Sequence, residues 1–102
     1  MQIEILTVPG CPNGPVLTQR LAEVLGDNRE VPVVQRSVAD QEEAARRGMH
    51  GSPTLLIDGR DPFAAPDTPP SLSCRLYPAP DGSRHGAPSV EDLRRALHDA
   101  VQ

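Results

Sequence analysis

A short run near the middle of the chain, Thr54-Leu55-Leu56-Ile57-Asp58, limits the possible folds more than any other segment. Its apolar residues follow one another without polar alternates, so a strand formed here has no face that suits water. Strands of this kind are typical of a sheet that is covered on both faces. We therefore expect a central strand at residues 54–58, with other parts of the chain packed on both sides of it.

Three further segments are predicted to be strands. β-branched residues in a rough period of two are found at residues 2–8 and 32–38, and a cleaner alternation is found at residues 72–77. Residues 59–71 contain four prolines, which favour a long loop over a helix. This Pro-rich loop separates the third strand from the fourth, which would otherwise form a hairpin.

Three helices are predicted between and after these strands. After the first strand, apolar residues lie on one helical face at Leu17, Leu21, Val24 and Leu25. Asp40, with Glu43 three residues later, is typical of a helix N-cap, and that helix is expected to end near Gly48. Ser89 is the expected N-cap of the last helix, whose apolar face holds Val90, Leu93, Leu97 and Val101. The resulting order is β-α-β-α-β-β-α, an α/β fold.

Size, charge and hydropathy exclude several classes of protein. A chain of 102 residues is expected to form one domain, residues 1–102. The net charge of −4 and the two aromatic residues, Phe63 and Tyr77, disfavour nucleic acid as a partner. No apolar run approaches the ~20 residues of a membrane span. A strand pattern begins almost at Met1, where a signal peptide would show a basic head and an apolar stretch. We therefore expect a cytoplasmic protein without a membrane partner.

Cys11 is the first candidate for chemistry, because it stands between the first strand and the first helix. A thiol at a helix N-terminus faces unpaired backbone N–H groups and the positive end of the helix dipole, which both favour the nucleophilic thiolate. Two helix starts remain open. If the helix begins at Pro12, Pro15 falls at its fourth position and crowds the Cys11 carbonyl. If Gly14 is the cap, Cys11 stands one turn farther out and the dipole acts on it more weakly.

The second candidate is Ser52-Pro53, directly before the apolar strand. A proline in front of a central strand is costly unless it has a special geometry. A cis peptide bond supplies such a geometry, and cis bonds in folded proteins are nearly confined to X-Pro pairs. The alternative is a trans proline that simply begins the strand.

Two segments resemble a known family. Residues 48–57, Gly-Met-His-Gly-Ser-Pro-Thr-Leu-Leu-Ile, resemble the cis-proline segment of thioredoxins and related disulfide-handling proteins, and Cys11-Pro-Asn-Gly resembles their active-site motif. The predicted β-α-β-α-β-β-α order also resembles the minimal thioredoxin fold. The resemblance implies a four-stranded mixed sheet in the order 2-1-3-4, flanked by helices, with residues 59–71 as an insertion.

The same resemblance implies the roles of individual residues. Cys11 and a cis Pro53 are expected to lie side by side as catalytic residues, and the backbone near Ser52 is expected to be offered to an extended peptide or a disulfide. The residues expected to contact the substrate are Pro12, Asn13, Gly14, Ser52 and Thr54.

The sequence departs from the family pattern at three positions. Gly14 replaces the second cysteine of the motif, Ile5 replaces the buried acid six residues before the active cysteine, and Gly10 replaces the tryptophan directly before it. Without a thiol at position 14, a mixed disulfide on Cys11 has no resolving neighbour within the motif. The resemblance is therefore to a single-cysteine member of the family.

Cys74 and His50 are the remaining candidates. In the expected sheet, Cys74 lies two strand spacings, about 9.6 Å, from the first strand, and a disulfide needs Cα atoms within ~7 Å. Leu72, Cys74 and Leu76 share one strand face, so Cys74 is either a buried core thiol or a participant that needs a loop movement. His50 is either a cationic neighbour that stabilises the Cys11 thiolate or a solvated loop residue.

Three functions follow from these readings. The first is thiol–disulfide exchange, or capture of a soft electrophile, at Cys11, with a protein or small-molecule thiol or disulfide as partner and no cofactor. The second is a redox-inactive thioredoxin-like binding module. The third comes from residues 52–59 and 71–77, which resemble segments of bacterial proteins labelled alkylmercury-lyase-like; it would require Cys11, Cys74 and Asp61 to converge. No metal site is expected, because no Cys-x-x-Cys or paired His spacing is present.

Overall fold

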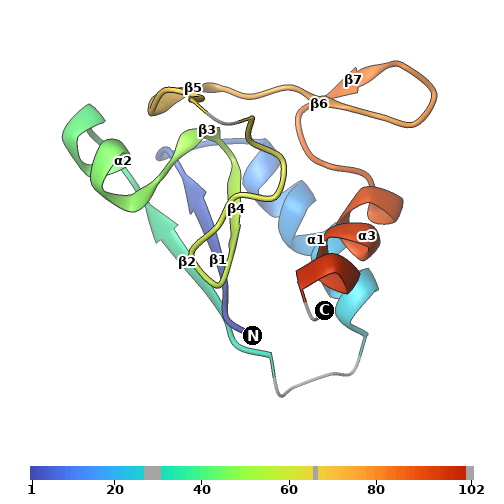
Figure 1. Cartoon of the computed structure of the whole chain (residues 1–102). Coiled ribbons are helices and arrows are strands. Elements are labelled where there is room, and N and C mark those ends of the chain that lie inside the picture. Colours follow the sequence, from blue (N-terminus) through green and yellow to red (C-terminus); the bar gives the residue numbers. More distant parts are fainter. Residues whose placement is uncertain (27–30, 66, 101–102) are drawn as a thin grey trace.

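The computed structural model describes residues 1–26, 31–65 and 67–100, and Val101 of the expected last helix lies outside them. Its central sheet has three strands in the order β2-β1-β4, with β1 at Ile3–Thr7, β2 at Val33–Ser37 and β4 at Thr54–Ile57. β1 pairs in parallel with β2 and antiparallel with β4, as in an α/β fold (Figure 1). The strands predicted at residues 2–8, 32–38 and 54–58 are therefore confirmed, with slightly shorter bounds.

Helices cover both faces of this sheet. The helices are α1 at Asn13–Leu25, α2 at Gln41–Arg47 and α3 at Val90–Ala100. Figure 1 shows α1 and α3 on one side of the sheet and α2 on the other. Leu55 and Ile57 are buried in the cluster formed with α1 and α3, whereas Leu56 is buried with Ala44 of α2. The apolar run of β4 is thus covered on both faces, as its sequence predicts.

The expected helix caps are present. The Asp40 carboxylate accepts a hydrogen bond from the Glu43 N–H at 2.7 Å, and the Ser89 hydroxyl accepts one from the Asp92 N–H at 3.1 Å. Gly48 ends α2 in the left-handed conformation that favours glycine. No helix among the described residues is long and apolar enough to cross a membrane.

The expected sheet order 2-1-3-4 is wrong in its last strand. The chain after the Pro-rich loop forms β5, Ser71–Cys74, which does not join β4. It pairs in parallel with β3, His50–Ser52, the short strand directly before Pro53. β4 is consequently at the edge of the three-stranded sheet and β1 is its central strand, so the expected central position of residues 54–58 is wrong, although both faces of β4 are covered.

Local chemistry explains why β4 and β5 do not form a hairpin. Asp58 and Gly59 turn the chain with positive φ angles, and Arg60 pairs back with Ile57 in one isolated bridge. Pro62 follows, and proline has no N–H to continue such a ladder. The Asp61 carboxylate instead accepts a hydrogen bond from the Phe63 N–H, which turns the chain away from β4.

The strand predicted at residues 72–77 is divided in two. β5 ends at Cys74, and Tyr77–Pro78 forms a separate strand, β6, that pairs antiparallel with β7 at Arg84–His85. The side chains do not alternate as the sequence predicts: Leu72 is half-buried, Cys74 is exposed, and Leu76 is 60% exposed. Of the two alternatives for Cys74, the buried core position is therefore wrong.

Candidate functional site

Cys11 lies between β1 and α1, half-buried and with a free thiol. α1 begins at Asn13 with Pro12 as its N-cap, so Cys11 stands directly before the cap. Pro15 is then the third helical residue, where the backbone N–H would have no partner within the helix in any case. The helix start therefore lies between the two alternatives, one residue later than a start at Pro12 and earlier than a start capped by Gly14. A turn closed by a 3.2 Å hydrogen bond from the Cys11 N–H to the Val8 carbonyl holds the segment.

The loop that carries Cys11 borders an open cavity of about 550 Å³. Its walls come from the β1–α1 loop, from α1 and from β2, and include Cys11, Gly14, Thr18, Gln19, Gln35 and Ser37. Most of these side chains are small or uncharged polar groups. The thiol therefore borders a groove that a small polar molecule can enter.

Three neighbours of Cys11 have different environments. Pro12 is exposed, and Asn13 packs against Gly86, where an added Cβ would meet the Asn13 amide nitrogen at 2.2 Å. Gly14 is buried, and a Cβ built on it would lie 3.0 Å from the Thr7 methyl carbon. The position that holds the second cysteine in the family motif is therefore packed tightly against β1 in this chain.

The Ser52–Pro53 peptide bond is cis, the alternative that the family resemblance implies. Ser52 and Pro53 are attached to two separate parts of the molecule. The Val8 N–H donates a 3.1 Å hydrogen bond to the Ser52 hydroxyl, and the buried Tyr77 hydroxyl donates one to the Pro53 carbonyl. Val8 begins the turn that ends at Cys11, so Ser52 is linked by one hydrogen bond to the loop of the thiol.

The backbone carbonyl of Ser52 is already occupied. It accepts a 3.1 Å hydrogen bond from the Arg75 N–H, and the Ser71 N–H donates at 3.0 Å to the Met49 carbonyl. The segment before Pro53 is therefore paired with the chain's own β5, although the family resemblance implies that it is open to a peptide. Thr54 is also engaged internally, since its hydroxyl donates to the Gly51 carbonyl at 2.5 Å.

A buried ionic and aromatic cluster holds the end of β5, and sequence reasoning missed it. The Arg75 guanidinium forms a 2.5 Å ion pair with Asp61, and only 11% and 3% of the two side chains are exposed. The same guanidinium lies 4.5 Å from the centroid of the Tyr77 ring, a cation–π contact. In the sequence, Arg75 and Tyr77 are two residues apart, a spacing that puts two side chains on one face of an extended chain and could have indicated their contact. No local pattern identifies Asp61 as the partner of Arg75.

This ion pair argues against the third function considered from the sequence, that of the alkylmercury-lyase-like proteins. That chemistry would use Asp61 as a carboxylic acid near two thiols. The Asp61 carboxylate is instead committed to Arg75 and to the Phe63 N–H. Among the described residues, no group of three or more His, Cys, Asp or Glu side chains is close enough to hold a metal ion.

Tyr77 is the titratable group that this environment changes most. Burial raises the pKa of Tyr77 above its ordinary value near 10, and the negative charges of Asp61 and Cys11 add to the rise while Arg75 opposes it. The folded protein therefore keeps Tyr77 protonated, as its hydrogen bond to Pro53 requires.

We expect Tyr77→Phe to lower the free energy of unfolding by about 1–3 kcal/mol at neutral pH, because the buried Pro53 carbonyl loses its donor. A raised folded-state pKa contributes stability below pH 10, and this contribution is lost as the pH rises further. The free energy of unfolding of the wild type should therefore fall above pH 10, and that of the variant should fall less steeply. Urea unfolding at several pH values measures both. If the free energy of unfolding falls equally steeply in both proteins above pH 10, Tyr77 is not the group whose ionisation destabilises the fold. Tyr77 is the single tyrosine, so absorbance titration follows it alone.

His50 and Cys74 lie on either side of the β3–β5 pairing. A ring nitrogen of His50 lies 3.3 Å from the Pro69 carbonyl, so the imidazole is directed at the Pro-rich loop. Cys74 is exposed with a free thiol, and its Cα is the register partner of Ser52. The structure thus gives His50 a loop contact and brings Cys74 next to the residue that precedes Pro53.

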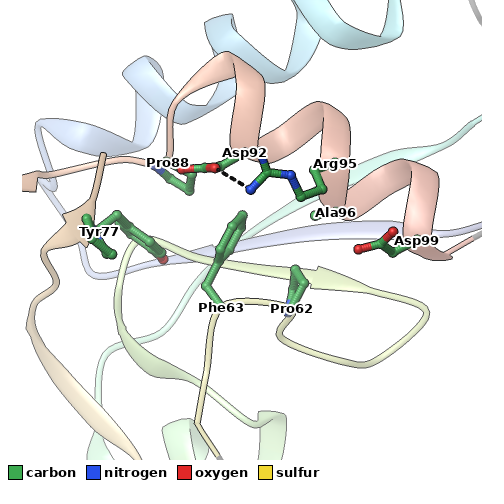
Figure 2. A pocket seen from close by; sticks show the side chains of 9 residues that line it. Pro62, Phe63, Tyr77, Pro88, Asp92, Arg95, Ala96 and Asp99 are labelled. Atoms are coloured by element: carbon green, nitrogen blue, oxygen red, sulfur yellow. Dashed lines mark hydrogen bonds and ion pairs between the residues drawn. The ribbon is translucent and has the colours of Figure 1, made fainter. Parts of the chain in front are cut away.

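A second cavity, of about 480 Å³, lies on the far side of Tyr77 (Figure 2). It is formed between the loop after β4, β6 and α3. Figure 2 shows the Phe63 and Tyr77 rings meeting at its wall, with centroids 5.5 Å apart at 83°. Asp92 and Arg95 of α3 form an exposed ion pair on the opposite wall. The contact with Phe63 supports the Tyr77 ring.

Together these observations define an α/β domain with a free cysteine at a strand–helix junction and a cis-proline segment before a buried strand. The family model described as a thioredoxin domain matches residues 1–63 of the 102-residue chain. The chain belongs to the thioredoxin domain family. Neither a curated protein nor a solved structure matches it significantly. The matched segment ends before β5, so Cys74, Arg75 and Tyr77 lie outside it.

Proposed function

We propose that this protein carries out single-thiol chemistry at Cys11, in which the thiolate attacks a disulfide and forms a mixed disulfide. One observation carries the proposal: a free, half-buried thiol stands directly before the N-cap of α1 and borders a polar groove. The first N–H groups of a helix have no partner within it, and with the helix dipole they favour a negative charge nearby. The thiolate is the form of cysteine that exchanges with disulfides.

The substrate class that we propose is a small disulfide rather than an extended peptide. A peptide that paired with the backbone before Pro53 would have to displace β5, because the Ser52 carbonyl already accepts from Arg75. The groove beside Cys11 remains open and is lined by polar side chains such as Thr18 and Gln35. In this proposal Pro12, which is exposed, and Ser52, which anchors the Cys11 loop, flank the reacting sulfur.

The test compares the two thiols of the same chain. Near neutral pH we expect Cys11 in the Cys74→Ser variant to react with glutathione disulfide about tenfold faster than an ordinary exposed thiol, because it stands directly before the N-cap of α1 and borders the open groove. Cys74 in the matched Cys11→Ser variant should react at the ordinary rate. Mass spectrometry of quenched samples follows the mixed disulfide in each. Equal rates in the two variants would refute the proposal and favour a redox-inactive binding module.

A further inference from the structure

We infer that Cys74 is the resolving thiol of this site: it attacks the mixed disulfide on Cys11 and closes an intramolecular Cys11–Cys74 disulfide. This inference rests on the proposed function, since it begins from a mixed disulfide on Cys11. It differs from the family motif, in which the second cysteine stands three residues after the first. Here that position is Gly14, packed against Thr7.

The pairing of β5 with β3 brings Cys74 to the correct segment. The Cα of Cys74 is in register with that of Ser52, and neighbouring strands lie about 4.8 Å apart. Paired residues on adjacent strands project their side chains to the same face. The Ser52 hydroxyl on that face contacts the Val8 N–H at 3.1 Å. The Cys74 side chain is therefore on the face of β3 that meets the loop of Cys11.

The loop of Cys11 also contacts this short strand, through the hydrogen bond from Val8 to Ser52. β3 contacts β1 as well as β5, and Cys11 is held at the end of β1 by its turn with Val8. Figure 1 shows β3, β5 and the β1–α1 loop gathered at one end of the molecule. Cys74 and the Cys11 loop thus both meet at Ser52, Cys74 through the strand pairing and the loop through the hydrogen bond of Val8.

Closing the disulfide requires a small displacement of β5. Two bridged cysteines have Cα atoms within ~7 Å of each other, so the end of β5 or the Cys11 loop must shift until the two sulfur atoms meet beside Ser52. Both thiols are free in the structure. β5 is four residues long and pairs only with β3 among the described residues. The exposed Cys74 thiol can therefore move without leaving a packed core.

The chemistry balances without a further reagent. The Cys11 thiolate attacks one sulfur of the substrate disulfide, forms a new S–S bond and releases the first substrate thiolate. The Cys74 thiolate then attacks the Cys11 sulfur and releases the second. The substrate disulfide gains two electrons and ends as two thiols, while the two protein thiols lose two electrons and end as one disulfide. An external small thiol returns the protein to its reduced form.

The test uses one equivalent of 2,2′-dithiodipyridine with dilute, reduced, full-length protein. We expect the wild type to release two equivalents of thiopyridone and to become a monomer with an internal disulfide, seen by peptide mapping. The Cys74→Ser variant should release one equivalent and keep the thiopyridyl group on Cys11. A matched control, Ser73→Cys in the Cys74→Ser background, moves the thiol one residue along β5 to the other strand face and should also stop at one equivalent.

The outcomes separate this inference from the proposed function. If the wild type stops at one equivalent with the thiopyridyl group on Cys11, Cys74 is not the resolving thiol, although the single-thiol chemistry stands. A second equivalent that appears only with disulfide-linked dimers also overturns the inference. If Cys11 in the Cys74→Ser variant reacts no faster than an ordinary exposed thiol, the proposed function fails first. If the Ser73→Cys control releases a second equivalent of thiopyridone as the wild type does, the position of Cys74 in β5 does not matter, and the inference is overturned.

Discussion

Asp61→Ala is expected to lower the free energy of unfolding by about 3–5 kcal/mol, because it leaves a buried guanidinium without its counter-ion. The Arg75 side chain is only 11% exposed, and its 2.5 Å contact with Asp61 is the most buried ion pair among the described residues. A loss of this size is a large fraction of the ~5–15 kcal/mol by which a domain is usually stable. Urea unfolding with a constant m-value measures it.

The controls for this prediction come from the same region. Asp99 lies at the exposed end of α3, and Asp99→Ala should change stability by less than ~0.5 kcal/mol. The double variant Asp61→Leu, Arg75→Met removes both charges and should recover part of the loss, since it leaves neither ion unpaired. If Asp61→Ala behaves like Asp99→Ala, the ion pair does not hold the Pro-rich loop in the way that we describe.

The cluster also connects stability to the site. Arg75 is held by Asp61 through its side chain and by Ser52 through its backbone N–H, so one residue joins the Pro-rich loop to the segment before Pro53. Tyr77 adds a second link through the Pro53 carbonyl. The residues after 63 are outside the matched family segment, yet they cover the backbone that the resemblance predicts to be open. Substitutions in the cluster should therefore alter both stability and access to Ser52.

The elements that depend on local signals were predictable from the sequence. The caps at Asp40 and Ser89 act within one helical turn, and the apolar run of β4 needs only to be buried, so each appears where its residues indicate. The position of Cys11 before α1 follows from the strand, turn and helix patterns on either side of it. These signals are short in range, and burial of the same residues reinforces them.

The partner of β5 was not predictable, because it depends on contacts between distant residues. A regular alternation at residues 72–77 suggests one strand with a buried face, but Arg75 leaves this pattern to reach Asp61, and the strand ends at Cys74. The choice of β3 as partner also depends on the absence of a side chain at Gly51. Sequence periodicity does not detect such a fit, and the alternation at residues 72–77 therefore favours a buried position for Cys74 that the structure does not show.

Gly51→Ala is the substitution that tests this fit most directly, and we expect it to cost about 2–4 kcal/mol through backbone strain and overpacking. Gly51 has a φ of +118°, a conformation that residues with a side chain rarely adopt. An added Cβ would lie 2.9 Å from the Arg75 Cβ and 3.1 Å from the Ser73 carbonyl oxygen. Because both contacts belong to the end of β5, the variant should push β5 away from β3.

Gly82→Ala separates the two causes of that loss. Gly82 also has a positive φ, of +88°, but an added Cβ there would meet nothing within 4 Å. It should therefore cost only the ~1–2 kcal/mol of the backbone conformation. Below the unfolding temperature, Gly51→Ala should retain the first release of thiopyridone and lose the second, whereas Gly82→Ala should retain both. Equal stability losses in the two variants, with both releases intact, would mean that close packing of β5 on β3 does not position Cys74.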